Sequence, residues 1–271
     1  MLRMFLAGLV LVAMPSVVQA GPYLDCDFAH DLGAKIRGCT HVIEKEKSNR
    51  KVQAMAYNNR GIAYHRSGQS ELAIADFTKS YEINPKYTDA KRNRGIAYKE
   101  TGQLDRALLD FNELLRDHYG LSQVYFDRGT VFEAKGMLKE ALADYTRVAK
   151  ARPTYAAVFN NRGNIYAEMK QFDLAIKDFT EAISIRPDHA PTYYNRGNAY
   201  RRQNQDNKAI ADYTKAIKFD PYYMEAHNNR GVAHEKLGQH EKAIADYRRA
   251  LKINPDANLA AKRLEALGTK P

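Results

Sequence analysis

The chain has 271 residues, of which 44% are hydrophobic and 27% are charged. This balance excludes both a disordered polar chain and a chain built of membrane-spanning segments, so the protein can bury a core. The formal net charge is +10, and the basic residues are spread along the chain, which favours anionic partners in general without marking one basic patch.

Residues 1–20 form a candidate signal peptide. Arg3 supplies a positive start, residues 4–14 are an apolar run of 11, and Ala20 closes a small-residue cleavage pattern. A stable membrane anchor is the weaker alternative, because a helix that spans a bilayer needs about 20 apolar residues. A lipoprotein is weaker still, because the nearest cysteine, Cys26, lies beyond the cleavage position. We therefore expect cleavage after Ala20, no stable membrane span afterwards, and a periplasmic or secreted protein.

The segment 21–53 is interpreted as an N-terminal cap that contains both cysteines, Cys26 and Cys39. In an oxidising compartment we expect them to form a disulfide, and their spacing is not that of a Cys-x-x-Cys redox motif. Two buried free thiols are the alternative. Residues 28–46 are expected to be helical, with Ile36, Cys39, Val42 and Ile43 on one side.

A strict 34-residue period runs through residues 54–257. Each copy contains a glycine, an alanine twelve residues later and an aromatic residue four positions after the alanine. The glycines are Gly61, Gly95, Gly129, Gly163, Gly197 and Gly231, and the aromatics are Phe77, Phe111, Tyr145, Phe179, Tyr213 and Tyr247. Two apolar stripes at helical spacing, separated by a polar stretch, predict a helical hairpin in each copy. Glycine and alanine are expected where the two helices approach closely, so that the aromatic side chain fills the remaining gap.

This period, the Gly-Ile-Ala-Tyr of the first copy, and the alanine, aromatic and proline that follow resemble the tetratricopeptide repeat family. The resemblance implies six tandem repeats in an exported, bacterial-type protein. It also implies an all-α fold, a right-handed α-α superhelix of stacked hairpins. The repeats would be residues 54–87, 88–121, 122–155, 156–189, 190–223 and 224–257. A capping helix and tail would follow at 258–271, with Leu259, Leu264 and Leu267 facing inward.

Two charged positions recur with the same period. Arginine precedes the glycine in every copy, at Arg60, Arg94, Arg128, Arg162, Arg196 and Arg230. Aspartate precedes the aromatic in every copy, at Asp76, Asp110, Asp144, Asp178, Asp212 and Asp246. Because these positions lie nearly level in an antiparallel hairpin, we expect six internal Arg–Asp pairs, which specify register more than they add stability. The alternative is that the arginines face outward and bind anions.

The residue before the arginine is asparagine in five of the six copies, at Asn59, Asn93, Asn161, Asn195 and Asn229. An amide side chain offers a donor and an acceptor, so a row of asparagines can satisfy the backbone of an extended peptide. Asparagines at matching positions do this in some tetratricopeptide superhelices that the chain resembles. A helix-capping or inter-repeat hydrogen bond that never meets a ligand is the alternative.

The resemblance implies that the first helices of the repeats line a concave face that binds partners. The predicted peptide-binding residues are Asn59, Asn93, Asn161, Asn164, Asn195, Asn198, Asn229, Arg92, Phe126, Tyr194, Arg201 and Arg202. Some members of the family bind the C-terminal carboxylates of chaperones with a clamp of lysine, arginine and asparagine, and this sequence lacks the clamp lysines. An acidic C-terminal ligand of that kind is therefore not expected.

No phosphate loop, nucleophile elbow or His-Glu-x-x-His segment occurs, so we do not expect an enzyme. His227, His234 and His240 lie close in the sequence but lack further ligands, so neither a metal nor a cofactor is expected. The expected function is a non-catalytic scaffold that binds a peptide segment of an envelope protein on its concave face. A binder of anionic envelope glycan or lipid headgroups is the alternative, and export argues against a nucleic-acid partner.

Overall fold

The structure is a computed structural model, and it describes residues 21–117 and 121–270. The candidate signal peptide lies outside the described residues. The chain divides into two compact units, one within residues 1–97 and one within residues 98–271. No helix in the described ranges is long and apolar enough to cross a membrane.

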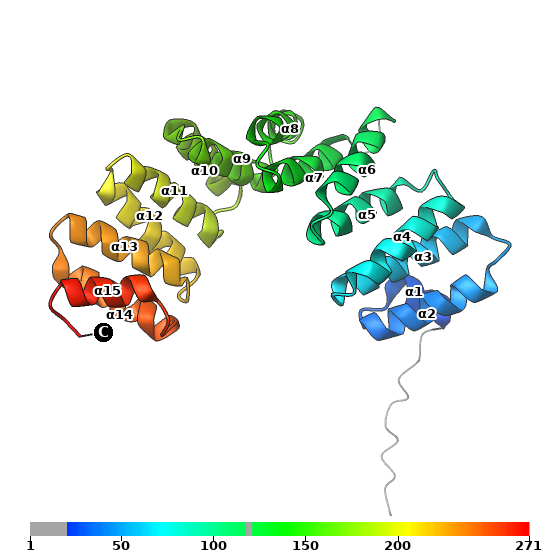
Figure 1. Ribbon diagram of the computed structural model, residues 1–271, viewed down its shortest axis with the longest axis horizontal. Helices are drawn as coiled ribbons and strands as arrows, with labels where there is room; N and C mark the ends of the chain where they lie inside the picture. The colour runs from blue at the N-terminus through cyan, green and yellow to red at the C-terminus, as the bar shows by residue number, and fades with distance from the viewer. Residues whose placement is uncertain (1–20, 118–120, 271) are drawn as a thin grey trace, which may run out of the picture. The chain divides into compact units, whose positions relative to one another are not determined.

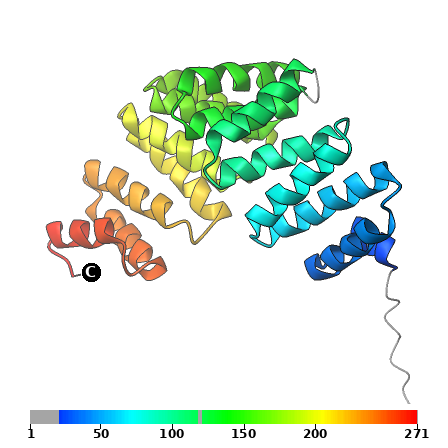
Figure 2. The ribbon, with the colours of Figure 1, turned by 45° about the vertical axis from the view of Figure 1, so that its right-hand side comes forward.

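Within its described ranges the chain is all-α, as predicted, and has no strand. The first unit contains α1 (Pro22–Phe28), α2 (Leu32–Lys45), α3 (Arg50–Arg66), α4 (Ser70–Ile83) and most of α5 (Thr88–Glu100). The second begins with the end of α5 and continues through α6 (Leu104–Arg116), α7 (Leu121–Ala134), α8 (Leu138–Ala151), α9 (Ala156–Glu168), α10 (Phe172–Ile185), α11 (Ala190–Arg202), α12 (Asp206–Phe219), α13 (Met224–Lys236), α14 (His240–Ile253) and α15 (Asn258–Ala266). Figure 1 and Figure 2 show that α3 and α4 in the first unit, and α7 to α14 in the second, follow one another as antiparallel pairs.

Each hairpin closes where a glycine of its first helix meets an aromatic ring of its second. A Cβ atom on Gly163 would lie 2.7 Å from the ring of Phe179, whose side chain is completely buried. Real Cβ atoms do not come so close to a ring carbon, so only glycine lets the helices approach this far. Gly61, Gly129, Gly197 and Gly231 meet Phe77, Tyr145, Tyr213 and Tyr247 at 2.7 to 2.8 Å in the same way. The predicted close approach is confirmed in these five hairpins.

The turn between the two helices of a hairpin contains one residue with a left-handed backbone. Glycine occupies this place at Gly68, Gly102, Gly136 and Gly238, with φ between 69° and 78°. Lys170 and Asn204 take the same conformation in the other two hairpins, with φ of 59° and 58°. A side chain in this region is strained, most of all for a residue other than asparagine or aspartate.

The predicted Arg–Asp pairs are confirmed in five hairpins. Arg162 donates through Nε and Nη2 to both carboxylate oxygens of Asp178, at 2.6 and 2.8 Å. The corresponding pairs are Arg60–Asp76, Arg128–Asp144, Arg196–Asp212 and Arg230–Asp246, with distances from 2.7 to 2.9 Å. The arginine side chains are 15–20% exposed and the aspartates 2–8%, so outward-facing arginines are the wrong alternative for these five. The pairing of Arg94 with Asp110 stays a prediction.

The third nitrogen of each arginine reaches the preceding element. Arg162 Nη1 donates to Thr146 Oγ1 of α8 at 3.4 Å, and Arg196 Nη1 donates to Thr180 Oγ1 of α10 at 3.0 Å. One guanidinium therefore joins both helices of its own hairpin to the hairpin before it. Because a guanidinium is planar and its donors are fixed in a fork, this arrangement favours one register of stacking.

The N-terminal cap consists of two helices. The helix predicted over residues 28–46 is present as α2, but it begins later, at Leu32, because Asp31 Oδ1 accepts a hydrogen bond from the backbone N–H of Ala34 and so caps the start of the helix. The predicted disulfide between Cys26 of α1 and Cys39 of α2 is present, and both residues are buried. No cysteine is left free, so the alternative of two thiols is wrong.

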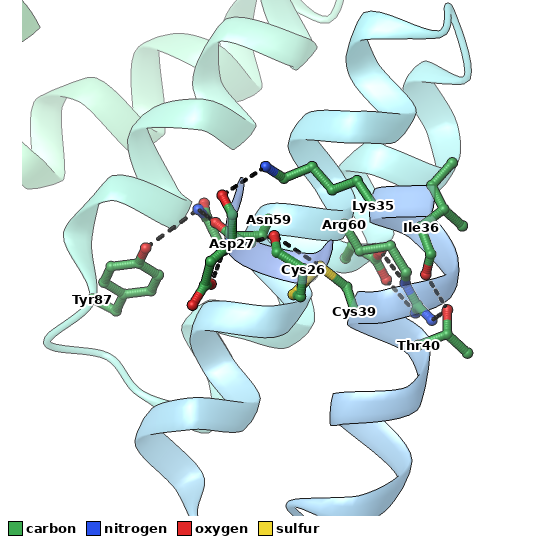
Figure 3. Close-up of a disulfide and its surroundings, with 11 residues drawn as sticks. Cys26, Asp27, Lys35, Ile36, Cys39, Thr40, Asn59, Arg60 and Tyr87 are labelled. Carbon is green, nitrogen blue, oxygen red and sulfur yellow. Dashed lines mark hydrogen bonds and ion pairs between the residues drawn. A yellow bond between two sulfur atoms is a disulfide. The ribbon is translucent and has the colours of Figure 1, made fainter. Parts of the chain in front are cut away.

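The cap is attached to the first hairpin by polar side chains (Figure 3). Asn59 of α3 donates to Asp27 Oδ1 of α1 at 3.1 Å, and Arg60 donates to Thr40 Oγ1 of α2 at 3.0 Å. The disulfide fixes α1 to α2, and these two bonds fix both helices to α3. The α1 segment therefore depends on the disulfide together with a few polar contacts.

The C-terminal helix α15 covers the end of α14. Leu264 is completely buried and packs with Tyr247 and Ala250. The prediction that Leu259 faces inward is wrong, since this side chain is 45% exposed.

Candidate functional site

The predicted binding residues of the second unit gather on one surface. We call the surface formed by α9, α11 and α13, the first helices of three consecutive hairpins, the first-helix face. Helix α11 contacts both α9 and α13, so the three helices adjoin within the unit (Figure 1). The face carries Asn161, Asn164, Tyr194, Asn195, Asn198, Arg201, Arg202 and Asn229. Asn59, Arg92 and Asn93 belong to the first unit, and Phe126 lies on α7.

Asparagines link successive hairpins across the first-helix face. Asn195 Nδ2 of α11 donates to Asn164 Oδ1 of α9 at 3.0 Å. One repeat later, Asn229 Nδ2 of α13 donates to Asn198 Oδ1 of α11 at 2.8 Å and to the hydroxyl of Tyr194 at 3.0 Å. These are the inter-repeat hydrogen bonds that the sequence left open as an alternative, and the amide nitrogens make them without a ligand.

We call Asn164, Asn195, Asn198 and Asn229 the asparagine ladder. Half of their side-chain amide atoms make no hydrogen bond to another described residue. Across the described ranges, Nδ2 of Asn164 and of Asn198 donates to no protein atom, and Oδ1 of Asn195 and of Asn229 accepts from none. All four side chains are partly exposed. The ladder therefore presents two free donors and two free acceptors in one row, while its internal bonds hold each amide in a fixed orientation.

The other predicted asparagines, outside the ladder, make different hydrogen bonds. Asn161 Nδ2 donates to the hydroxyl of Tyr145 at 3.4 Å, within its own neighbourhood of α8 and α9. In the first unit, Asn93 donates to Asn58 Oδ1 at 2.9 Å, and Asn59 donates to Asp27 of α1. The regular Asn–Asn ladder is thus a feature of α9, α11 and α13.

The two predicted aromatics pack against rings of neighbouring elements. Phe126 lies 5.7 Å from Tyr145 and 5.0 Å from Tyr155, measured between ring centroids. Tyr194 lies 5.9 Å from Tyr213 and 4.9 Å from Tyr223. Both rings are partly exposed, so each can offer an edge to a ligand while the rest of the ring packs in the hairpin.

A further position of the first helix lies four residues after the glycine, and of its six residues only Arg201 is among the predicted binding residues. Where the ring of the hairpin is tyrosine, a polar partner stands near this position: Glu133 accepts from the Tyr145 hydroxyl at 2.8 Å and Glu235 from Tyr247 at 2.7 Å. Burial raises the pKa of Tyr213 to about 12, and Arg201 beside the hydroxyl acts in the opposite direction by lowering this pKa. Burial also raises the pKa of the Glu133 carboxyl, and the Tyr145 hydroxyl opposes this.

In the fourth hairpin the ring is Phe179, and the same position holds Ala167. A pocket of about 180 Å³ opens there between α9 and α11. It is lined by Asn164, Ala167, Phe172, Phe179, Asn195, Asn198, Ala199 and Arg202. Comparing the six residues at this position, which are His65, Lys99, Glu133, Ala167, Arg201 and Glu235, would have marked Ala167 as the one small side chain.

A second pocket of about 240 Å³ lies nearer the start of the same two helices, and its lining includes Asn160, Asn161, His189 and Thr192. Thr192 Oγ1 donates to Asn160 Oδ1 at 3.0 Å, so its polar atoms are partly committed to each other. Burial lowers the pKa of His189, as does nearby Arg186, so the imidazole is neutral near pH 7.

Acidic and basic side chains are unevenly placed along the first-helix face. Glu133 of α7 and Glu168 of α9 lie close enough that Glu168 contributes to the raised pKa of Glu133. Beyond the Ala167 pocket, α11 ends in Arg201 and Arg202, whereas Glu235 and Lys236 at the end of α13 pair with Arg263 and Asp206. Nε of Arg201 is buried and has no hydrogen-bond partner in the part of the chain that the structure describes.

The three histidines of the last hairpin have separate surroundings. His227 Nδ1 lies 3.4 Å from Asp246 Oδ1, and His234 Nδ1 lies 2.8 Å from Gln239 Oε1. Among the described residues, no three His, Cys, Asp or Glu side chains are grouped as ligands for a metal ion.

Comparison with protein-family models gives matches along most of the chain. Models described as tetratricopeptide repeat match residues 54–87, 92–156, 156–189, 179–211 and 225–257, and one described as TPR repeat matches residues 197–238. No curated protein sequence matches the chain.

Solved structures share the fold at low sequence identity. Pseudomonas aeruginosa PilF aligns with a TM-score of 0.70 and 15% identity, over 80% of this chain and 99% of that chain. A chain of the APC/C hetero-tetramer Cut9–Hcn1 aligns with a TM-score of 0.67 and 17% identity, over 90% of this chain and 50% of that chain. MamA aligns with a TM-score of 0.57 and 22% identity, over 59% of this chain and 94% of that chain. At these identities the likeness concerns the fold alone.

Proposed function

We propose, from the premise that this chain belongs to the tetratricopeptide repeat family, that it is a non-catalytic scaffold whose first-helix face binds an extended segment of a partner protein. The binding residues would be the asparagines of α9, α11 and α13 with the side chains around them.

The observation that carries this proposal is the pattern of free amide atoms on the asparagine ladder. An extended peptide presents backbone N–H and C=O groups in alternation, and each needs a partner of the opposite kind. Asn164 and Asn198 offer free N–H donors, and Asn195 and Asn229 offer free carbonyl acceptors. Because the ladder is already held by its own hydrogen bonds, little side-chain freedom is lost on binding.

The ladder alone would bind weakly. A hydrogen bond contributes about 1 kcal/mol net, so four such bonds contribute about 4 kcal/mol. That free energy corresponds to a dissociation constant of about 1 mM. A useful affinity therefore requires side-chain contacts in addition to the backbone contacts.

We also propose that the scaffold acts outside the cytoplasm on a protein of the cell envelope. The leader pattern of residues 1–20 supports this, and so does the disulfide between Cys26 and Cys39, since such bonds persist in oxidising compartments.

The alternative ligand, an anionic glycan or lipid headgroup, has less support. The arginines of five hairpins donate to aspartates of their own hairpin and are mostly buried, so they are not available to anions. Binding of such a ligand would fall steeply between low and moderate salt, whereas a peptide held by amides and apolar contacts would be less sensitive.

Site-directed photo-cross-linking in the cells that make the protein tests the proposal. A benzoylphenylalanine residue would replace Glu168, which is exposed on α9, and in a matched control Lys177, which is exposed on α10 of the same hairpin. We expect a cross-linked partner protein from position 168 and none from position 177. Equal cross-linking from both positions, or none from either, would count against the first-helix face as the binding surface.

A further inference from the structure

We propose that the pocket at Ala167 is the specificity pocket of this scaffold, and that it takes one aliphatic side chain of an extended segment that carries an acidic residue within about three positions on the α13 side. This inference rests on the proposed function and adds to it the kind of segment that is bound.

The floor of the pocket is apolar. Phe179 and Ala199 are almost completely buried and belong to one packed cluster, against which Ala167 and Phe172 also pack. The volume of about 180 Å³ can hold one side chain of the size of leucine, isoleucine or methionine. The accessible apolar part of the lining comes from Ala167 and Phe172, and an aliphatic side chain that covers them removes this surface from water.

The rim of the pocket is made by the asparagine ladder. Asn164, Asn195 and Asn198 line the pocket and are three of the four residues with free amide atoms. A backbone that bonds to these amides therefore passes directly over the opening. Because alternate side chains of an extended segment point to opposite faces, one of them is directed into the pocket.

The hairpins on either side cannot accept a side chain in this way. In α7 and α13 the matching position holds Glu133 and Glu235, each hydrogen-bonded to the tyrosine ring of its own hairpin. In α11 the position holds Arg201, next to Tyr213. In the second unit only the fourth hairpin combines a small residue with a phenylalanine ring. In the first unit a pocket of about 220 Å³ lies at the matching place of the first hairpin, and its lining includes His65, Phe77 and Asn93.

The charges near the pocket favour an acidic residue close to the aliphatic residue in the bound segment. Arg202 lines the pocket and is exposed, and Arg201 precedes it on the same helix end, beside the Tyr213 hydroxyl. Glu168 stands at the end of α9, on the opposite side. An acidic side chain is therefore attracted to the α11 end of the pocket, which is its α13 side, and repelled from the α9 end.

The distance between neighbouring helices sets how many residues separate the aliphatic and the acidic side chain of the bound segment. Packed helices lie about 8–10 Å apart, and an extended chain advances about 3.3 Å per residue. The acidic residue consequently falls within about three positions of the aliphatic one.

A phage-displayed library of random dodecapeptides is the probe. It would be selected on the wild-type chain, on Ala167→Leu, which fills the pocket, on Arg202→Glu, and on Ala211→Leu. The last is a matched control, because Ala211 is exposed on α12, away from the first-helix face. A second pocket variant, Ala167→Glu with Phe179→Tyr, gives the fourth hairpin the residue pair that the third and sixth already have. Circular dichroism verifies that each variant is folded.

We expect the wild-type chain and Ala211→Leu to enrich peptides with an aliphatic residue and an acidic residue within three positions of each other. Both pocket variants should lose the aliphatic preference, and Arg202→Glu should exchange the acidic preference for a basic one. A synthetic copy of the best peptide should bind Ala167→Leu at least about tenfold more weakly than the wild type, because a buried aliphatic side chain contributes about that much.

Enrichment of the same aliphatic peptides by the wild type and by both pocket variants would overturn the specificity pocket and leave the scaffold function standing. Enrichment without an acidic preference would overturn the assignment of the arginines. If the folded wild-type chain enriches no peptide over an empty support, the proposed function fails, and this inference fails with it.

Discussion

Replacing Gly163 by alanine sets two known effects against each other. Alanine is favoured over glycine in the middle of a helix by about 1 kcal/mol. At this place, however, the added Cβ would lie 2.7, 2.8 and 3.1 Å from three ring carbons of Phe179, where carbon atoms normally stay about 3.5–4.0 Å apart. Phe179 is completely buried, so its ring cannot turn away without disturbing its neighbours. Overpacking of this kind costs about 1–3 kcal/mol, and three close contacts place it near the upper end. We expect a net loss of about 1–2 kcal/mol.

Urea unfolding followed by circular dichroism measures the change, and native-state hydrogen exchange of α9 and α10 localises it, because repeat arrays need not unfold in one step. The control is Gly163→Ala in a Phe179→Leu background, where the ring is gone and the helix-propensity gain should reappear relative to Phe179→Leu alone. If Gly163→Ala instead stabilises the wild-type chain by about 1 kcal/mol, the glycine is not needed for close approach and the account of the hairpin is wrong.

Three further changes test other parts of the fold. Lys170→Gly relieves the strained left-handed turn at φ 59° and should raise the free energy of unfolding by about 0.5–1 kcal/mol in urea titrations; an unchanged or lower midpoint would contradict this. Asp178→Asn leaves the mostly buried guanidinium of Arg162 without its charge partner and should cost about 2 kcal/mol, whereas a loss below about 0.5 kcal/mol would mean that the pair is dispensable. Reducing the Cys26–Cys39 disulfide should destabilise the first unit by about 3 kcal/mol and remove hydrogen-exchange protection from α1; protection that persists after reduction would show that polar contacts alone hold this helix.

Periodicity was sufficient to predict the hairpins and the ion pairs. A glycine and an aromatic residue 16 positions apart recur in every copy, and so do an arginine and an aspartate at the same separation. In an antiparallel hairpin, two residues equally distant from the turn lie nearly level. Arg162 and Asp178 are each eight residues from the turn residue Lys170, so their contact can be expected from the spacing.

Features that depend on single residues were harder to predict. The break in the N-terminal cap depends on the side chain of Asp31, which caps α2, and helical periodicity does not register such a cap. The asparagine ladder could be predicted as a row, but not the direction of its hydrogen bonds, because an amide can donate or accept equally well. The pocket at Ala167 lies in the one hairpin that combines an alanine at this position with a phenylalanine ring, which becomes visible only when the copies are compared position by position.

The central claim is that the first-helix face binds an extended segment through the free amide atoms of its asparagines. Nuclear magnetic resonance of the side-chain amides, during titration with the segment found by cross-linking or with the best library peptide, tests this most directly. We predict that the NH₂ signals of Asn164 and Asn198 shift with the titration while that of Asn207, exposed on α12, stays in place. Unmoved signals from Asn164 and Asn198 at saturation would contradict the account.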